Sequence, residues 1–247
     1  MIALLMIALA HADPTTLATV ADPGTDLVTS MAEGVQGAPV ATSVRLLLML
    51  TGLTFLPAMV IVMTPFVRFV VVFSLLRQAL GLNQSPPNQV IIGLSLFLSL
   101  VVMEPTLQVS WDQGVSPFLA GEMEARPALD STLAPLRTFM LSNTRRSDMA
   151  TVLEVGRREA PASLEDIPTP SIVSAFVLSE LKTALIISVY VFVPFLVIDL
   201  VVSSTLLGMG MMMLPPVVVS LPFKLIVFVA MDGWGLLVRD LVAGISR

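Results

Sequence analysis

Ionisable side chains interrupt the longest apolar stretches of this sequence. Four of them lie within or beside those stretches: Glu180, Asp199, Lys224 and Asp232. Charged groups at the depth of a bilayer are costly, and they normally face protein or water and pair with one another. Such residues could relay protons or ions, coordinate a metal, or form ion pairs between subunits. No cluster of metal ligands accompanies them. We favour inter-subunit charge pairs that fix the register of an assembly.

Asp199 and Lys224 stand on either side of an irregular stretch at about residues 207–216. Each lies about eight residues from that break, which corresponds to about 12 Å along a helix. Their similar depth predicts an Asp199–Lys224 pair, either within one hairpin or between neighbouring subunits. Asp232 lies about 12 Å further along and needs another partner. The candidates nearest the polar ends are Glu180, Lys182 and Arg239.

Two arginines lie in the apolar segment from Thr64 to Gly81. The segment is expected to be a helix, because Pro65 suits a first turn and Gly81 suits a C-terminal cap. Arg68 and Arg77 project about 180° apart on an ideal helix, so they cannot serve one site in one subunit. They are expected to contact different surroundings, either in other subunits or, by snorkelling, at the membrane interface.

The stretch between the last two apolar segments is rich in glycine, proline and methionine. Glycine and proline are poor helix-interior residues, so they are expected to interrupt the helices and to make the stretch flexible. These residues are Gly208, Gly210, Pro215 and Pro216, and the methionines among them are Met209, Met211, Met212 and Met213. Methionine packs against many shapes without fixing one. We interpret the stretch as a flexible methionine collar around a passage, with a hairpin turn filled by apolar residues as the alternative.

The composition is that of an integral membrane protein. The 247 residues are 55% hydrophobic and 13% charged, with a mean hydropathy of +0.91, whereas soluble domains carry about 25% charged residues. The absence of cysteine excludes disulfides and thiolate metal sites, and the net charge of -5 gives no basic surface for nucleic acid. No phosphate loop, dinucleotide fingerprint, zinc-helix motif or nucleophile elbow is present. The sequence therefore gives little support to an enzyme and implies no cofactor.

Two segments precede the first long apolar stretch. Residues 1–12 resemble the end of a secretory signal peptide, because an apolar run is followed by the small-x-small triplet Ala10-His11-Ala12. Cleavage is expected between Ala12 and Asp13, and an uncleaved N-terminus is the alternative. Residues 13–43 have no apolar period and are expected to form an extracytoplasmic linker.

The rest of the chain is expected to be an all-α membrane protein made of bent helical hairpins. Four apolar segments are long enough to span a membrane or nearly so: 44–63, 89–103, 183–207 and 217–238. The second is expected to end at Glu104-Pro105, and Glu180 and Lys182 are expected to open the third. The predicted units are a hydrophobic hairpin at 44–110, a polar helical insert at 111–179 and a second hydrophobic hairpin, with the collar, at 180–247.

Charge predicts the orientation of these segments. The connection from Thr64 to Pro87 contains arginines and no acid, whereas residues 112–166 carry more acidic than basic side chains. The positive-inside rule places the first connection in the cytoplasm and the insert outside, in the periplasm. A cleaved N-terminal signal gives the same orientation.

Several long runs resemble the signatures of the FliP family of flagellar type III export-gate proteins, which has a relative, SctR, in virulence injectisomes. The first signature is matched by residues 68–81 and 86–90, and the second by residues 194–200, 209–216 and 223–234. The motifs agree in order and spacing over about residues 44–242. The resemblance implies a subunit in the bacterial inner membrane, in the flagellar basal body, rather than an enzyme.

The resemblance also implies the partners of the chain. Family members assemble as about five copies with FliQ and FliR, contact FlhB and FlhA, lie in membrane lipid, and pass unfolded flagellar proteins. Their motif methionines form a gasket, which Met209, Met211, Met212 and Met213 would supply here. The charged residues of the matched segments then favour inter-subunit pairing over proton relay.

Other classes of function fit the sequence less well. A secondary transporter for a small solute would show broken helices repeated in its two halves, and neither the arginine segment nor the collar has a counterpart. An intramembrane enzyme would need a nucleophile with a base, or a metal set. An injectisome subunit is the near alternative, but the signal-like N-terminus and long linker favour a flagellar one.

Overall fold

The computed structural model of the chain describes residues 58–59, 61–82, 84–157, 163, 166–211 and 214–245, together with Leu47, Thr51 and Thr54. These residues, apart from the last three, belong to one compact unit, Ala58–Arg247. Several predicted features lie outside the described residues. They are the signal peptide 1–12 with its cleavage site at Ala12 and Asp13, the linker 13–43, most of the segment 44–63, and the collar residues Met212 and Met213.

The unit is built from helices, and no strand occurs in the described part of the chain. The elements are α5 (Phe66–Ala79), α6 (Asn88–Ser110), the π-helical turn η1 (Trp111–Val115), α7 (Ser116–Leu119), α8 (Ala125–Ser142), α9 (Arg146–Val155), α10 (Thr169–Gly208), α11 (Pro216–Ala230) and α12 (Gly233–Ala243). The prediction of an all-α membrane protein is confirmed.

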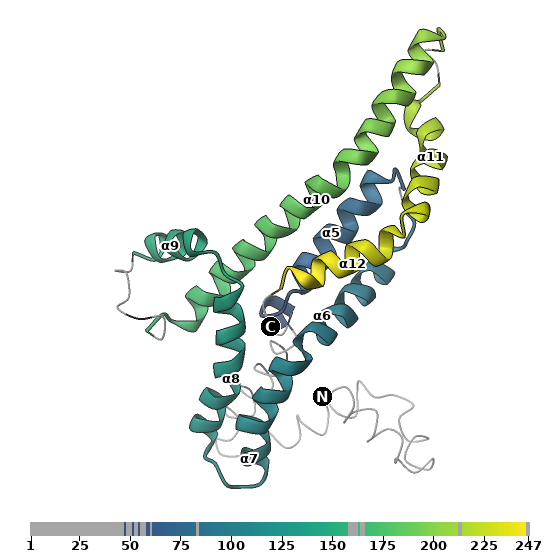
Figure 1. The fold of residues 1–247 in the computed structure, drawn as a ribbon. Coiled ribbons are helices and arrows are strands. Elements are labelled where there is room, and N and C mark those ends of the chain that lie inside the picture. Colours follow the sequence, from purple (N-terminus) through teal and green to yellow (C-terminus); the bar gives the residue numbers. More distant parts are fainter. Residues whose placement is uncertain are drawn as a thin grey trace, which may run out of the picture. The chain divides into compact units, whose positions relative to one another are not determined.

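Within this unit the long helix α10 is the element against which the others are arranged (Figure 1). Helix α5 packs along it, and α6 packs on α5. At the far end of α10 the chain turns back as α11, and α12 then runs beside α5 (Figure 1). Helices α8 and α9 pack on the opposite end of α10. The C-terminal and N-terminal apolar helices therefore form one packed body.

Helix α5 supplies the centre of the core. Its apolar residues recur at helical spacing, so Phe69, Val72, Phe73 and Leu76 lie on one buried face. The facing part of α10 is buried through Ile172, Ala175 and Phe176. Helix α6 presents two fully buried serines, Ser95 and Ser99, whose small size permits close helix packing in apolar surroundings.

The structure corrects the predicted ends of two helices. Helix α6 does not stop at Glu104-Pro105 but runs to Ser110 with Pro105 inside it. A proline there costs about 3 kcal/mol, but Val102, Met103 and Leu107 still pack on the core and hold the helix. Helix α10 begins at Thr169 rather than near Glu180 or Thr183, because its apolar face continues upstream. The division at 179/180 therefore falls inside one helix.

The last apolar segment is broken rather than continuous. Helices α11 and α12 meet at an angle of 63°, and Asp232 has a left-handed backbone conformation with φ of 50°. Aspartate tolerates that conformation better than most residues. A side chain at Gly233 would lie 2.2 Å from the ring of Phe228, so the bend requires glycine there. The apolar segment 217–238 is therefore made of two helices that meet at a bend.

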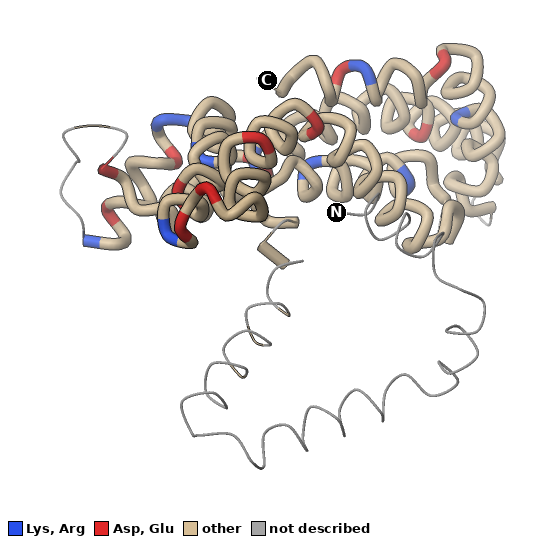
Figure 2. The backbone as a smooth tube through the Cα atoms, turned by 90° about the horizontal axis from the view of Figure 1, so that it is seen from below, with Lys and Arg blue, Asp and Glu red and all other residues tan. Residues whose placement is uncertain are grey.

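The apolar helices satisfy the length and composition of membrane spans. In the described residues two stretches do so, Asn88–Leu119 and Thr169–Gly208, and the bent pair α11–α12 would make a third. The charged residues gather more densely around α8 and α9, but further charged residues lie along the other helices (Figure 2). The apolar helices therefore carry charged side chains of their own, some of which form ion pairs.

Candidate functional site

The predicted collar connects α10 to α11. Helix α10 ends with Met209 as its C-cap, and Gly210 follows with φ of +75°. The amide of Gly210 donates to the Leu207 carbonyl (3.0 Å), and the amide of Met211 donates to the Leu206 carbonyl (2.9 Å). These two bonds form a Schellman motif, in which the left-handed position favours glycine. Gly210 therefore has a defined part in ending the helix, where the sequence suggested only flexibility.

The described collar residues are exposed. Met209 is 61% exposed and Met211 is 46% exposed, while nothing lies within 4 Å of a side chain built at Gly208. Helix α11 then begins at Pro216 with Pro215 as its N-cap, which agrees with the preference for proline in a first turn. The hairpin thus ends in an apolar tip that the described residues do not cover.

A buried ion pair joins α5 to α10. Arg68 Nε donates to Glu180 Oε2 at 2.8 Å, and Arg68 Nη2 donates to Glu180 Oε1 at 2.5 Å. The side chains are only 3% and 1% exposed. Arg68 Nη1 also donates to the carbonyl of Gly244 at 3.0 Å, so the guanidinium holds the end of α12 as well. The bidentate geometry is the strong form of such a pair.

A second charge pair lies near the collar end of the hairpin. Lys224 Nζ donates to Asp199 Oδ2 at 2.6 Å and to the carbonyl of Ala79 at 2.9 Å. Ser220 Oγ donates to Asp199 Oδ1 at 2.5 Å. The ammonium group thus satisfies a carbonyl at the C-terminus of α5, where a cation is also favoured by the helix dipole. The predicted Asp199–Lys224 pair is present, within one chain.

These two pairs lie within one chain. Arg68, Glu180, Asp199 and Lys224 each have an ionic partner in the same chain, and their contacts with a neighbouring subunit stay a prediction. The pairs form because α5, α10 and α11 pack together, so that the distant charges meet inside one subunit. Only Asp199 keeps substantial exposure, at 32% of its side chain.

The remaining predicted residues have other surroundings. Arg77 Nη1 donates to the Pro86 carbonyl (3.1 Å) and to Asn88 Oδ1 (2.7 Å), so it holds the turn between α5 and α6. The two arginines of α5 therefore contact different parts of the chain. Asp232 forms the bend between α11 and α12 and takes part in no ion pair with another described residue.

Sequence reasoning missed the contacts that attach α9 to α10. Asp148, in the first turn of α9, is fully buried and accepts hydrogen bonds from Ser179 Oγ (2.8 Å) and from Lys182 Nζ. The amide of Arg145 donates to Ser179 Oγ at 3.0 Å. The sequence signal was an acidic residue, Asp148, near the start of a helix. Its partners could not be found from that signal, because Ser179 and Lys182 belong to another helix.

The electrostatics of Asp148 follow from these contacts. Burial opposes ionisation and would raise the pKa of its carboxyl, but the hydrogen bonds from Lys182 and Ser179 and the charges of Lys182 and Arg145 outweigh it. The pKa of Asp148 therefore lies below its usual value of 3.8. Asp148 is ionised at neutral pH and holds the charged α8–α9 region to α10.

A third contact fixes the start of α10. Arg137 of α8 donates to the hydroxyl of Thr169 and, at 2.9 Å, to the carbonyl of Ile167. In the described residues, no group of three or more His, Cys, Asp or Glu side chains could hold a metal ion. Arg137 thus joins α8 to the start of α10.

Comparison with known proteins identifies the family. The chain matches the model of the FliP family over residues 49–241. The chain belongs to the FliP family. It is 46% identical over 214 residues to the flagellar biosynthetic protein FliP of Cereibacter sphaeroides. The matched region covers 87% of this chain and 71% of that protein. The FliP of Caulobacter vibrioides is 47% identical over 204 residues (83% and 77%), and that of Bacillus subtilis is 44% identical over 203 residues (82% and 92%).

Most of the features of the site fall inside the FliP-matched region. The collar, the two buried charge pairs and the α11–α12 bend all lie between residues 49 and 241. Residues 1–48, which include Ala12 and Asp13, precede it. The site residues predicted from the sequence, apart from that cleavage site, therefore belong to the part that the FliP relatives share.

Proposed function

We propose that this chain is a channel-forming subunit of the flagellar type III protein export gate in the bacterial inner membrane. In this proposal about five copies assemble with FliQ and FliR, contact FlhB and FlhA in the basal body, and pass unfolded flagellar proteins. The observation that carries it is the FliP-family match over residues 49–241. The flagellar names of the relatives favour a flagellar gate over an injectisome. The role is structural rather than catalytic.

The exposed tip of the hairpin supports a gasket. An apolar tip that the described residues leave uncovered can pack against the same tip of neighbouring copies around a central passage. Methionine side chains can close against one another and re-pack around a passing chain, because they are unbranched and have no fixed shape. We assign this role to Met209, Met211, Met212 and Met213. The Schellman motif at Gly210 supports a fixed base for the collar.

The charge pairs support a stiff frame beneath the gasket. Lys224 joins α11 to both α10 and α5, and Arg68 joins α5 to α10 and to the end of α12. In the proposal these contacts hold the hairpin while the collar adapts. Asp199 and Asp232 remain candidates for contacts with other subunits, because the first is one-third exposed and the second has no ionic partner among the described residues.

The proposal is tested by assembly and leak measured on the same preparation. The chain is expressed with its FliQ- and FliR-like partners. Native mass spectrometry is expected to give a closed complex of about five copies, each beginning at Asp13. In cells, the insert is expected to be accessible from the periplasm. A monomer or dimer that binds no partner would contradict the gate.

The gasket itself is tested by substitution. Replacing Met209, Met211 and Met212 together with alanine is expected to raise the small-ion leak of liposomes that contain the assembled complex, because the side chains that close the passage become short. Met231→Ala is the matched control, since Met231 is also half exposed but lies at the α11–α12 bend. Equal leak in the triple variant, the control and the parent would refute the gasket.

A further inference from the structure

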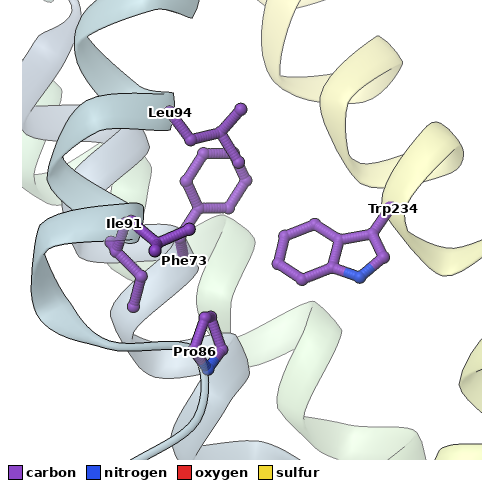
Figure 3. Close-up of a pocket in the computed structure, with 6 residues that line it drawn as sticks. Phe73, Pro86, Ile91, Leu94 and Trp234 are labelled. Atoms are coloured by element: carbon purple, nitrogen blue, oxygen red, sulfur yellow. The ribbon is translucent and has the colours of Figure 1, made fainter.

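A small apolar cavity lies between α5, α6 and α12. Its volume is about 140 Å³, and it is lined by Phe73, Pro86, Val90, Ile91, Leu94 and Trp234. The indole of Trp234 faces Phe73, Ile91 and Leu94 across the opening, with Pro86 at one end (Figure 3). The cavity is half open and its lining is wholly apolar, so it offers water no hydrogen-bond partners and accepts an apolar group. The cavity therefore fits a hydrocarbon group rather than a polar ligand.

A cation lies beside Pro86, one of the residues that line this cavity. Arg77 Nη1 donates to the carbonyl of Pro86 and to Asn88 Oδ1. Its Nε and Nη2 make no hydrogen bond with the residues that the structure describes, and its side chain is half-buried. Two guanidinium nitrogens, which carry three N–H groups, therefore remain available next to an apolar cavity. A planar fork of this kind suits a phosphate.

We propose that Arg77 and this cavity bind one anionic phospholipid, whose acyl chain enters the cavity and whose phosphate accepts hydrogen bonds from Arg77. The apolar cavity matches the acyl chain, and the guanidinium of Arg77 matches the negative phosphate beside it. The cavity also lies at the start of the stretch Asn88–Leu119, which is apolar enough to span a membrane. Basic pockets next to membrane helices bind lipid head groups in this way. The inference requires only that the chain lie in a membrane, and it does not depend on export.

Trp234 makes the site directly measurable. The sequence has two tryptophans, so Trp111→Phe leaves Trp234 as the single tryptophan of the full chain, and excitation at a wavelength that only tryptophan absorbs avoids its one tyrosine. Phosphatidylglycerol with a brominated acyl chain is titrated into the chain in neutral detergent micelles, and quenching of Trp234 is recorded. Saturable quenching is expected, with an apparent affinity about fivefold weaker for brominated phosphatidylcholine, because an interfacial arginine contributes about 1 kcal/mol toward an anionic lipid.

Two pairs of variants separate the head-group contact from the cavity. Arg77→Gln is expected to weaken the affinity for phosphatidylglycerol about fivefold and to leave the affinity for phosphatidylcholine unchanged. Arg239 is an exposed arginine of α12, and Arg239→Gln should leave both affinities unchanged. Leu94→Phe fills the cavity and is expected to abolish saturable quenching. Ile92→Phe is its control, because Ile92 lies on the same helix, is also exposed and does not line the cavity.

Two results would overturn the proposal. Equal quenching by both lipids, unaffected by Arg77→Gln, would mean that bulk hydrocarbon reaches Trp234 without a head-group site. Absence of quenching in the complex with its partner subunits, together with loss of assembly in Leu94→Phe, would mean that a protein side chain fills the cavity. Since assembly is measured separately by native mass spectrometry, failure of the lipid site can be distinguished from failure of the gate.

Discussion

The buried pair between Arg68 and Glu180 gives the sharpest test of how the unit is held together. Arg68→Met keeps an unbranched apolar side chain of similar length but removes both bonds to Glu180 and the bond to the Gly244 carbonyl. Glu180 is then left as a carboxylate that is only 1% exposed. Removing one partner of such a pair costs about 3–5 kcal/mol, because the remaining charge is buried without compensation.

Replacing both partners has a different expected outcome. The double variant Arg68→Met/Glu180→Leu leaves no buried charge, and only the Gly244 carbonyl loses a donor. Replacing a whole buried ion pair with apolar side chains is often neutral or stabilising. The lost hydrogen bond to the Gly244 carbonyl costs about 1 kcal/mol. The double variant is therefore expected to lie within about 1–2 kcal/mol of the parent, well below the sum of its single variants.

Equilibrium unfolding in mixed detergent micelles measures these differences. Trp234 is a suitable reporter, because its ring lies 5.8 Å from that of Phe73 in α5. Arg77→Met is the control for loss of an arginine from the same helix, and it should cost about 1 kcal/mol because Arg77 bonds only to neutral groups in a turn. The reasoning is refuted if the double variant loses as much stability as the two single variants added together.

Three further outcomes are expected from the same unfolding assay. Gly210→Ala should destabilise the protein by about 1–2 kcal/mol, because Gly210 has a φ of +75°. Gly208 lies inside α10 with open space around it, so Gly208→Ala should be neutral or stabilise by up to about 1 kcal/mol. Equal effects of the two substitutions would contradict the capping role of Gly210. Gly233→Ala should cost about 1–3 kcal/mol and change Trp234 emission, because the new methyl group would lie 2.2 Å from the Phe228 ring; unchanged emission and stability would show that the bend tolerates a side chain. The folded state lowers the pKa of Asp148 below 3.8, so its contribution to stability is present above pH 3.8 and is lost as the pH falls through the lowered pKa. Unfolding compared at about pH 7, 5 and 3 should show a loss only in the most acidic sample, and Asp148→Asn should reduce that loss; an equal loss in the variant would assign it to other groups.

Local signals predicted some features correctly. The cap of α5 is one, because Gly81 has φ of +76° and its amide donates to the Gln78 carbonyl at 2.9 Å, as a helix-ending glycine should. The Asp199–Lys224 pair is another, since equal distance from a turn places two residues of a hairpin side by side. Both depend only on residues close to the feature along the chain.

Features that depend on tertiary packing could not be predicted in the same way. Arg68 and Glu180 belong to helices that are distant in the sequence, and no spacing rule connects them. The start of α10 at Thr169 was missed because the polar residues around it suggested an insert, whereas Ile172 and Phe176 are buried by α5 and α8. The bend at Asp232 had the local sequence Asp-Gly, but a hydropathy pattern hides a turn inside an apolar run.

The continuity of α10 has a mechanical consequence. A helix of 40 residues is about 60 Å long, about twice the thickness of the hydrocarbon core of a bilayer. Arg137 and Asp148 form hydrogen bonds with its first part, and Met209 is the C-cap at the other end. The helix is therefore a lever: a rotation of about 5° at the Thr169 end would carry its far end through about 5 Å, roughly one helical turn. Because α5 and α11 pack along α10 and are joined to it by ion pairs, a displacement at the charged α8–α9 region would move these helices together and would shift the collar by about the size of a side chain.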